Sequence, residues 1–159
     1  MSAPIERLNR LSLSKIHQYF ADLAPPDRQS LQGIYRGLFV GPGWLTPLWP
    51  PTLSITGLGG WWGKDFYAPG EAVNIVLRKG VYQRRFQMYP VEQNSYLDAR
   101  PGLALRYRSD TPFPWPKIVD ELRRIDSDHI LGMTLAEIGP LRRLGFPFVL
   151  LKREGLDEL

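Results

Sequence analysis

The sequence predicts a mainly β fold, in which a single antiparallel β-barrel of about eight to ten strands follows an N-terminal α-helix. Three observations support this prediction. Apolar and polar residues alternate along short runs from Leu31 onward, as they do in half-buried strands. Turn-forming residues separate these runs, and the 159-residue chain holds 15 Gly and 15 Pro. Aromatic residues, which favour strands, make up 12 % of the chain.

The first part of the chain, residues 4–24, is expected to be helical. Ile16, Phe20 and Leu23 recur at the spacing of one helix face. Pro25-Pro26 ends the helix, because proline lacks the backbone donor that a helix needs. We expect the apolar face of this helix to cover one opening of the barrel.

Five alternating runs follow, and turn signals such as Pro69-Gly70 and Lys79-Gly80 lie between them. One of these runs places Ile75 on an apolar face opposite Asn74, so Ile75 is expected to line the interior. The runs predict a meander of antiparallel hairpins. They cover residues 31–41, 59–68, 71–79, 81–89 and 102–108.

Residues 116–135 allow two interpretations. Ile118, Leu122 and Ile125 fit a helix, whereas DELRRID and HILGMTL on either side of Ser127-Asp128 fit a hairpin. GFPFVLLKR, residues 145–153, forms a last strand in either case. Together these elements predict a single domain over residues 1–159, with the helix at 4–24 and the barrel at 31–154.

Composition and charge exclude several classes of function. The chain has no Cys and two His, so it predicts no disulfide, no thiol nucleophile and no cysteine-ligated or histidine-rich metal site. The net charge of +4 is spread without long basic runs, and we expect neither nucleic-acid binding nor a metal or other cofactor. The charged N-terminus resembles neither a signal peptide nor a transmembrane helix, which predicts a cytoplasmic location.

A long uncharged segment lies between Arg36 and Lys64, and its part at 41–62 is rich in Trp, Pro and Gly. Such a segment must be buried, cover a ligand, or contact a membrane or partner. One interpretation makes it part of the core over the barrel mouth. The other makes it a hydrophobic lid with Trp44 and Trp49 at the rim, where they could also touch a membrane surface.

Charged residues inside apolar strands are candidates for the barrel interior. An inward Arg or Lys needs a carboxylate partner or an anionic ligand, and Arg36, Lys64 and Arg106 are the leading candidates. The alternative is that these side chains point outward into solvent. Aromatic side chains are expected to supply the lining and complete the predicted binding site, namely Tyr35, Trp44, Trp49, Trp62, Phe66 and Phe86.

Catalytic motifs are scarce. The sequence has no G-x-S-x-G elbow and no phosphate-binding loop. His129 beside Asp126 or Asp128 could act as a general base, but a His on such a turn is more often an exposed polar residue, and we interpret it so. Three carboxylic acids, if buried in a barrel, could act as proton donors, and the catalytic candidates are Asp65, Asp98 and Asp120.

Two stretches resemble a known family. LQGIYRGLFVGPGWL followed by GWWGKDF is similar to the opening of GXWXG-domain proteins, with Tyr35 where that family has Trp. PKIVDELRRIDSDHILGMTL and FPFVLLKRE resemble the companion segment, domain of unknown function 4334. The resemblance covers residues 31–67 and 116–154. It implies a calycin-like barrel similar to lipocalins and fatty-acid-binding proteins, favours the hairpin at 118–135, and implies no activity. The positions that match the second pattern are Asp120, Leu122, Arg123, Asp126, Leu131, Gly132, Met133 and Arg153.

Two functions from different classes fit these observations. The first is binding of one small hydrophobic or lipid-like molecule, with at most one anionic group, inside the barrel. The second is a cofactor-free cyclase or isomerase that acts on a hydrophobic intermediate in the same cavity. The two functions differ in whether a pair of titratable groups points into the cavity.

Overall fold

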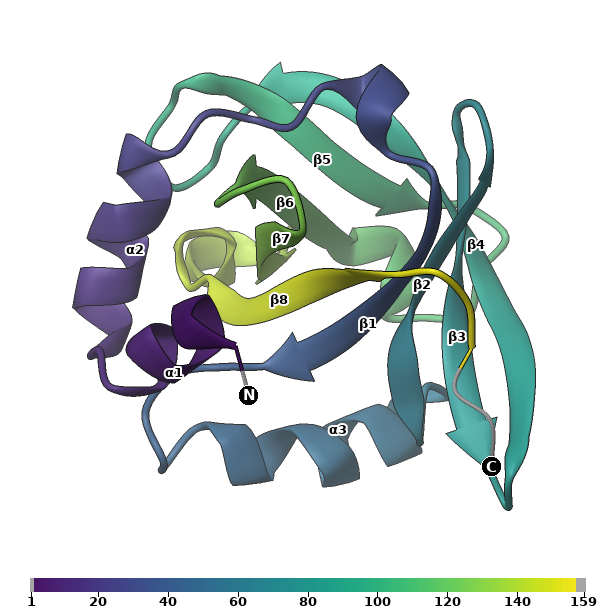
Figure 1. Cartoon of the computed structure of the whole chain (residues 1–159). Helices are drawn as coiled ribbons and strands as arrows, with labels where there is room; N and C mark the ends of the chain where they lie inside the picture. The colour runs from purple at the N-terminus through teal and green to yellow at the C-terminus, as the bar shows by residue number, and fades with distance from the viewer. Residues whose placement is uncertain (1, 157–159) are drawn as a thin grey trace.

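The fold is a closed, eight-stranded antiparallel β-barrel, which confirms the predicted class (Figure 1). This computed structural model describes residues 2–156. Each strand pairs with its neighbour in sequence, and β1 also pairs with β8 to close the barrel. The strands are β1 (Gly33–Phe39), β2 (Trp61–Ala68), β3 (Glu71–Arg78), β4 (Val81–Asn94), β5 (Pro101–Tyr107), β6 (Ile118–Arg124), β7 (His129–Ala136) and β8 (Phe146–Arg153).

The hairpin interpretation of residues 116–135 holds, because β6 and β7 pair in antiparallel register from Ile118↔Ala136 to Arg124↔Ile130. Because consecutive strands are antiparallel, successive loops lie at alternate ends of the barrel. Four loops, at residues 40–60, 79–80, 108–117 and 137–145, gather at one end of the barrel, which we call the lid end. The loops at 69–70, 95–100 and 125–128 lie at the opposite end.

The predicted N-terminal helix is present as two helices, α1 (Ala3–Asn9) and α2 (Leu13–Asp22). Ser12 interrupts it and caps α2, since its side-chain oxygen accepts a hydrogen bond from the Lys15 backbone. The buried faces of both helices pack on the outward-facing residues of β1, β7 and β8. The expectation that the helix covers an opening is therefore wrong: it covers the wall where the barrel closes.

The segment at 41–62 contains a helix that the sequence did not predict. The 3-10 turn η2 (Thr46–Leu48) leads into α3 (Trp49–Thr56), which crosses the lid end (Figure 1). Pro50 and Pro51 are tolerated because the first turn of a helix has backbone donors without intrahelical partners. Gly57, with φ of 96°, ends α3 in the left-handed conformation that glycine adopts most easily. Trp61 then begins β2, as expected.

The barrel interior is filled mainly by apolar side chains, together with a small group of polar ones that includes Asn74 of β3. The inward face of β3 carries Ala72, Asn74 and Val76, so Ile75 lies on the outward face and its expected place in the lining is wrong. Further 3-10 turns lie in the connections, namely η1 (Arg28–Ser30), η3 (Trp115–Lys117) and η4 (Gly139–Arg143). Among the described residues, no helix is long and apolar enough to cross a membrane.

Candidate functional site: a small cavity beneath α3

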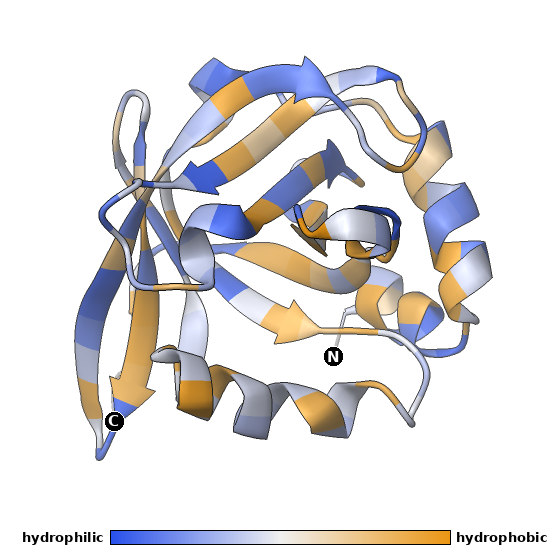
Figure 2. Cartoon of the chain, turned by 180° about the vertical axis from the view of Figure 1, so that it is seen from behind, coloured by the Kyte–Doolittle hydropathy of each residue, from blue (hydrophilic) through white to orange (hydrophobic). Residues whose placement is uncertain are grey.

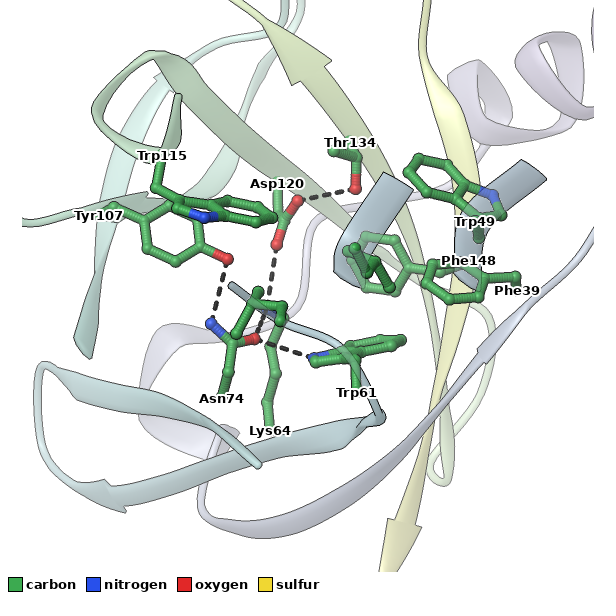
Figure 3. A pocket seen from close by; sticks show the side chains of 12 residues that line it. Phe39, Trp49, Trp61, Lys64, Asn74, Tyr107, Trp115, Asp120, Thr134 and Phe148 are labelled. Carbon is green, nitrogen blue, oxygen red and sulfur yellow. Dashed lines mark hydrogen bonds and ion pairs between the residues drawn. The ribbon is translucent and has the colours of Figure 1, made fainter. Parts of the chain in front are cut away.

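A small cavity lies inside the barrel directly beneath α3 (Figure 3). Its volume is about 40 Å³, which is enough for ordered water and too little for an organic ligand. Its walls combine aromatic side chains with a group of polar ones. The lining residues are Phe39, Trp49, Leu53, Leu58, Trp61, Lys64, Asn74, Tyr107, Trp115, Asp120, Thr134 and Phe148.

Lys64 and Asp120 form a buried ion pair in this cavity, reaching across the barrel from β2 and β6. Lys64 Nζ lies 3.0 Å from Asp120 Oδ2, and the two residues are 1 % and 4 % exposed. Thr134 donates a hydrogen bond of 2.9 Å to the other carboxylate oxygen. Because each charge is balanced by the other, the cavity carries no net charge from this pair.

Asn74 connects the pair to two aromatic residues. Its side-chain oxygen accepts hydrogen bonds from Lys64 Nζ at 2.8 Å and from Trp61 Nε1 at 2.9 Å. Its amide nitrogen donates to the Tyr107 hydroxyl at 3.0 Å (Figure 3). Tyr107 therefore keeps its own O–H as a donor toward a group in the cavity.

The environment of Tyr107 keeps that proton in place. Burial, and then the negative charge of Asp120, raise the pKa of the Tyr107 phenol well above its ordinary value. Above about pH 10 an unfolded chain releases this proton while the folded chain retains it, so folding stability falls as the pH rises.

We therefore expect the Tyr107→Phe variant to lose less stability in alkali than the wild type. By one pH unit above 10, the difference in this loss should be about 1 kcal/mol. Urea unfolding across pH 8 to 11 checks it, with Tyr89→Phe on the exposed wall as the matched control. Equal alkaline losses in Tyr107→Phe and the wild type would contradict the raised pKa.

Aromatic rings form most of the apolar wall. Phe39 stacks on Trp49 with ring centroids 4.7 Å apart and also contacts Trp61 at 5.1 Å. Phe148 meets Trp61 edge to face. Lys64 Nζ lies 5.5 Å from the Trp61 ring centroid, where a cation is attracted to the face of the ring. The cavity therefore combines flat aromatic surfaces with the polar groups of Lys64, Asn74 and Asp120, which we call its polar floor.

Helix α3 forms a lid over this cavity, and a few hydrogen bonds hold the C-terminal end of the helix and the residues that follow it. Trp115 Nε1 donates to the carbonyl oxygen of Thr56 at 2.6 Å. Arg78 donates to Gly59 and Gly57 carbonyl oxygens at 2.8 and 3.2 Å. Glycines on both sides of α3 provide conformational freedom for its movement.

The structure brings only some of the predicted binding residues to the cavity. Lys64 and Trp49 line it. Tyr35 and Phe66 contact each other in the interior core, outside the cavity lining. Phe86 packs against the same core from a partly buried position.

The other predicted binding residues lie outside the barrel interior. Trp44 is 64 % exposed on the lid end. Arg36 donates to the Trp62 carbonyl and lies over the Trp62 ring, while Trp62 packs edge to face on Tyr82. Arg106 pairs with Glu137 at 2.6 Å on the outer surface.

Of the three candidate acids, Asp120 alone lies in the cavity. Asp65 pairs with Arg84 at 3.0 Å on the outward face of β2. Asp98 pairs with Arg123 at 3.0 Å, and Arg123 also donates to backbone carbonyls at the end of α2. Desolvation raises the pKa of Asp98, but the Arg123 contact and other hydrogen bonds outweigh it, and the pKa is lowered. Asp65 and Asp98 therefore form ion pairs outside the cavity.

His129 is more buried than expected for a turn residue. It is 8 % exposed, and its Nδ1 lies 2.8 Å from Asp126 on the β6–β7 turn, far from α3 in the topology. Among residues 2–156, no His, Asp or Glu cluster forms a metal site.

Sequence reasoning missed several cavity residues, above all Asn74, Tyr107 and Thr134. Asn74 carried a usable signal, because an amide between Val73 and Ile75 in a buried strand needs hydrogen-bond partners inside the protein. Tyr107 shares one face of its run with Leu103 and Leu105, but its neighbour Arg106 was preferred as the inward residue, and no local pattern indicated Thr134.

Comparison with known proteins supports the fold alone. No protein-family model and no curated protein matches the chain. A crystal structure of a protein from Thermomonospora curvata is similar, with a TM-score of 0.71 and 19 % sequence identity. The match covers 94 % of this chain and 93 % of that one. At this identity the similarity establishes a shared barrel architecture.

Proposed function

We propose that the protein binds one small, uncharged and mainly apolar molecule in the cavity beneath α3. The observation that carries this proposal is the buried Lys64–Asp120 pair, which places a neutral polar floor inside an aromatic chamber. Ligand sites of this kind fix orientation with a few polar groups and gain affinity from apolar contact. A carbonyl or hydroxyl oxygen on the ligand would accept a hydrogen bond from the Tyr107 hydroxyl.

The ion pair also favours an uncharged ligand over an anionic one. An anion would compete with Asp120 for Lys64 and would leave the carboxylate buried without its partner, which is strongly unfavourable. A cation would compete with Lys64 for Asp120 and would leave the Lys64 ammonium group buried without its partner. The anionic group considered from the sequence is therefore replaced, in this proposal, by a neutral hydrogen-bonding group.

Binding requires α3 to move, because the cavity, with a volume of about 40 Å³, is too small for an organic molecule. The protein would then bind ligand through a less populated open state, and the apparent affinity would fall with the population of that state. α3 lies between glycine-containing segments and is held by Arg78 and Trp115, so it is the element best placed to open.

Two fluorescent probes test the preference for a neutral ligand. N-phenyl-1-naphthylamine and 1-anilinonaphthalene-8-sulfonate share one ring system, but only the second carries a negative charge. We expect the neutral probe to bind at least about tenfold more tightly to the wild type, since one unpaired buried charge costs more than 1.4 kcal/mol. Asp120→Asn should shift the preference toward the anionic probe by leaving Lys64 charged.

The double variant Lys64→Met/Asp120→Leu keeps this test decisive if Asp120→Asn folds poorly. With both charges removed, it should retain the neutral probe. The proposal fails if the wild type binds the anionic probe as tightly as the neutral one, or if it binds neither probe.

Lid opening gives a separate prediction. Arg78 does not line the cavity, yet it holds the carbonyls that follow α3. Arg78→Met should speed both association and dissociation of N-phenyl-1-naphthylamine by several-fold in stopped-flow fluorescence. Arg108→Met, which removes an exposed arginine paired with Asp110, is the matched control and should leave both rates unchanged. Unchanged rates in Arg78→Met would contradict a lid role for α3.

A second candidate function is a cofactor-free isomerase or cyclase, favoured by one observation: a titratable pair does line the cavity. The Asp120 carboxylate could take a proton from a carbon next to a carbonyl and return it elsewhere, while Tyr107 donates to the carbonyl oxygen. Incubation of 2-decalone with the protein in D₂O tests this step by NMR. Deuterium exchange next to the carbonyl should accelerate with the wild type and not with Asp120→Asn. No acceleration by the wild type would exclude this function for such ketones.

The resemblance to GXWXG-domain and domain of unknown function 4334 proteins, and the calycin-like assignment, are part of this proposal. They rest on the short motifs around Tyr35 and Asp120. They agree with a closed barrel that holds a ligand, and they add no activity to the proposed function.

A further inference from the structure

The large apolar side chains that remain exposed are gathered at the lid end. On α3 and the segment before it, Trp44 is 64 %, Leu48 54 % and Ile55 85 % exposed. In Figure 2, apolar bands alternate with paler ones along α3 at the edge of the molecule. The neighbouring loops and the start of β4 add to the same end, with Val81, Phe113, Ile138, Leu141 and Leu144.

The remaining barrel surface differs. Among residues 2–156, the other large exposed apolar or aromatic side chains are Tyr67 and Tyr89, which lie on strands of the wall. The loops of the opposite end contribute none. Several loops at one end, together with α3, thus form one apolar surface. Such a surface indicates a site of contact with another protein or a membrane.

The charges around this apolar surface indicate which kind of partner binds it. The residues from Gly37 to Gly63 hold no charged side chain, so α3 can leave water without burying a carboxylate. Around them, the other lid-end loops carry more basic than acidic residues. The basic residues are Lys79, Arg108, Lys117, Arg142 and Arg143, and the acidic ones are Asp110 and Glu137.

The opposite end has the reverse balance, since its loops carry Asp98, Asp126 and Asp128 against Arg100. A negatively charged flat surface would therefore attract the lid end more strongly than the opposite end. A second copy of the chain is a poorer fit, because a two-fold contact through the lid ends would bring basic loops together.

We infer that the lid end docks on the surface of an anionic lipid bilayer, with Trp44, Leu48 and Ile55 entering the headgroup region. Tryptophan favours this depth because its ring is amphipathic. Basic residues beside an apolar helix face strengthen such binding through the negative surface potential. None of the three apolar residues lines the cavity, so this surface is independent of what the cavity binds.

Vesicle sedimentation tests the inference. The wild type should bind phosphatidylcholine vesicles that contain phosphatidylserine, bind pure phosphatidylcholine vesicles much more weakly, and lose affinity as salt rises. Trp44→Ser/Leu48→Ser/Ile55→Ser should lower the affinity at least about tenfold. Lys79→Gln and Arg143→Gln should each lower it by about fivefold. The control Tyr67→Ser/Tyr89→Ser removes exposed rings from the wall and should bind like the wild type.

Three outcomes would overturn the inference: no binding of the wild type to anionic vesicles, binding that survives the triple substitution, or equal binding to both vesicle types. Light scattering adds a further criterion. A dimer that the triple substitution dissociates would assign the surface to a second copy of the chain. Retained binding of N-phenyl-1-naphthylamine by the triple variant would show that the fold and cavity are intact.

Discussion

Replacing Asp120 with Ala should lower the free energy of unfolding by about 3–5 kcal/mol, the usual effect of removing one partner of a buried ion pair. Lys64 would remain in a chamber of aromatic rings, 1 % exposed and without a counter-charge. The Thr134 hydroxyl would lose its acceptor as well. Urea unfolding followed by far-ultraviolet circular dichroism measures the loss.

The double variant Lys64→Met/Asp120→Leu is the control for this prediction. Replacing a buried pair with apolar residues of similar size is often neutral or stabilising, so the double variant should recover most of the lost stability. A small effect of Asp120→Ala, below about 1 kcal/mol, would mean that water reaches the pair. It would also remove the basis for a neutral cavity.

Replacing Gly63 with Ala should destabilise the barrel by at least about 3 kcal/mol, at the upper end of the usual cost of overpacking. A Cβ at Gly63 would overlap the backbone carbonyl oxygen of Tyr35 and lie 3.0 Å from the backbone nitrogen of Gly37. β1 cannot retreat, because it is paired with β8 on its other side. The β1–β2 pairing would have to separate locally.

Alanine substitutions at two other glycines serve as controls for the loss of stability expected of Gly63→Ala. At Gly37 the added Cβ would meet the ring of Trp61, a side chain that can rotate, so Gly37→Ala should cost less than Gly63→Ala. Gly43 has nothing within 4 Å of such a Cβ, and Gly43→Ala should change stability by less than about 0.5 kcal/mol. Equal urea midpoints for Gly63→Ala and Gly43→Ala would show that the β1–β2 approach is looser than described.

The strands were predictable because side-chain alternation is a local property. Most of β3 is buried on both faces, however, and alternation then fails to identify the interior face, which is why Asn74 was missed and Ile75 misplaced. The apolar face predicted for residues 4–24 indicated that this helix packs against the rest of the domain. No local pattern, however, identifies the surface of the barrel against which it packs. α3 was missed because proline normally argues against a helix, and its first turn is the exception.

The candidate site was only partly predictable, for a related reason. Lys64 was one of three candidates for an inward charge, because it interrupts an aromatic strand. Its partner could not be selected from Asp65, Asp98 and Asp120, since which side chains meet across a barrel depends on the stagger of all its strands. Irregularities such as the register shifts between β2 and β3 further change which residues lie opposite one another, and the residue pattern does not reveal them.

The pairing of β1 with β8 also bears on how the chain folds. This contact joins Ile34 to Arg153, so it closes the largest loop in the barrel, whereas every other strand pair joins neighbours along the chain. Closing such a loop is entropically expensive and is rewarded only once the intervening strands are in place. α1 and α2 pack on the same seam, so these two helices, which come before all eight strands in the chain, gain their native neighbours only when the last strands are in place. Hydrogen exchange during refolding should accordingly protect the β3–β4 hairpin early and β1 with its helices last.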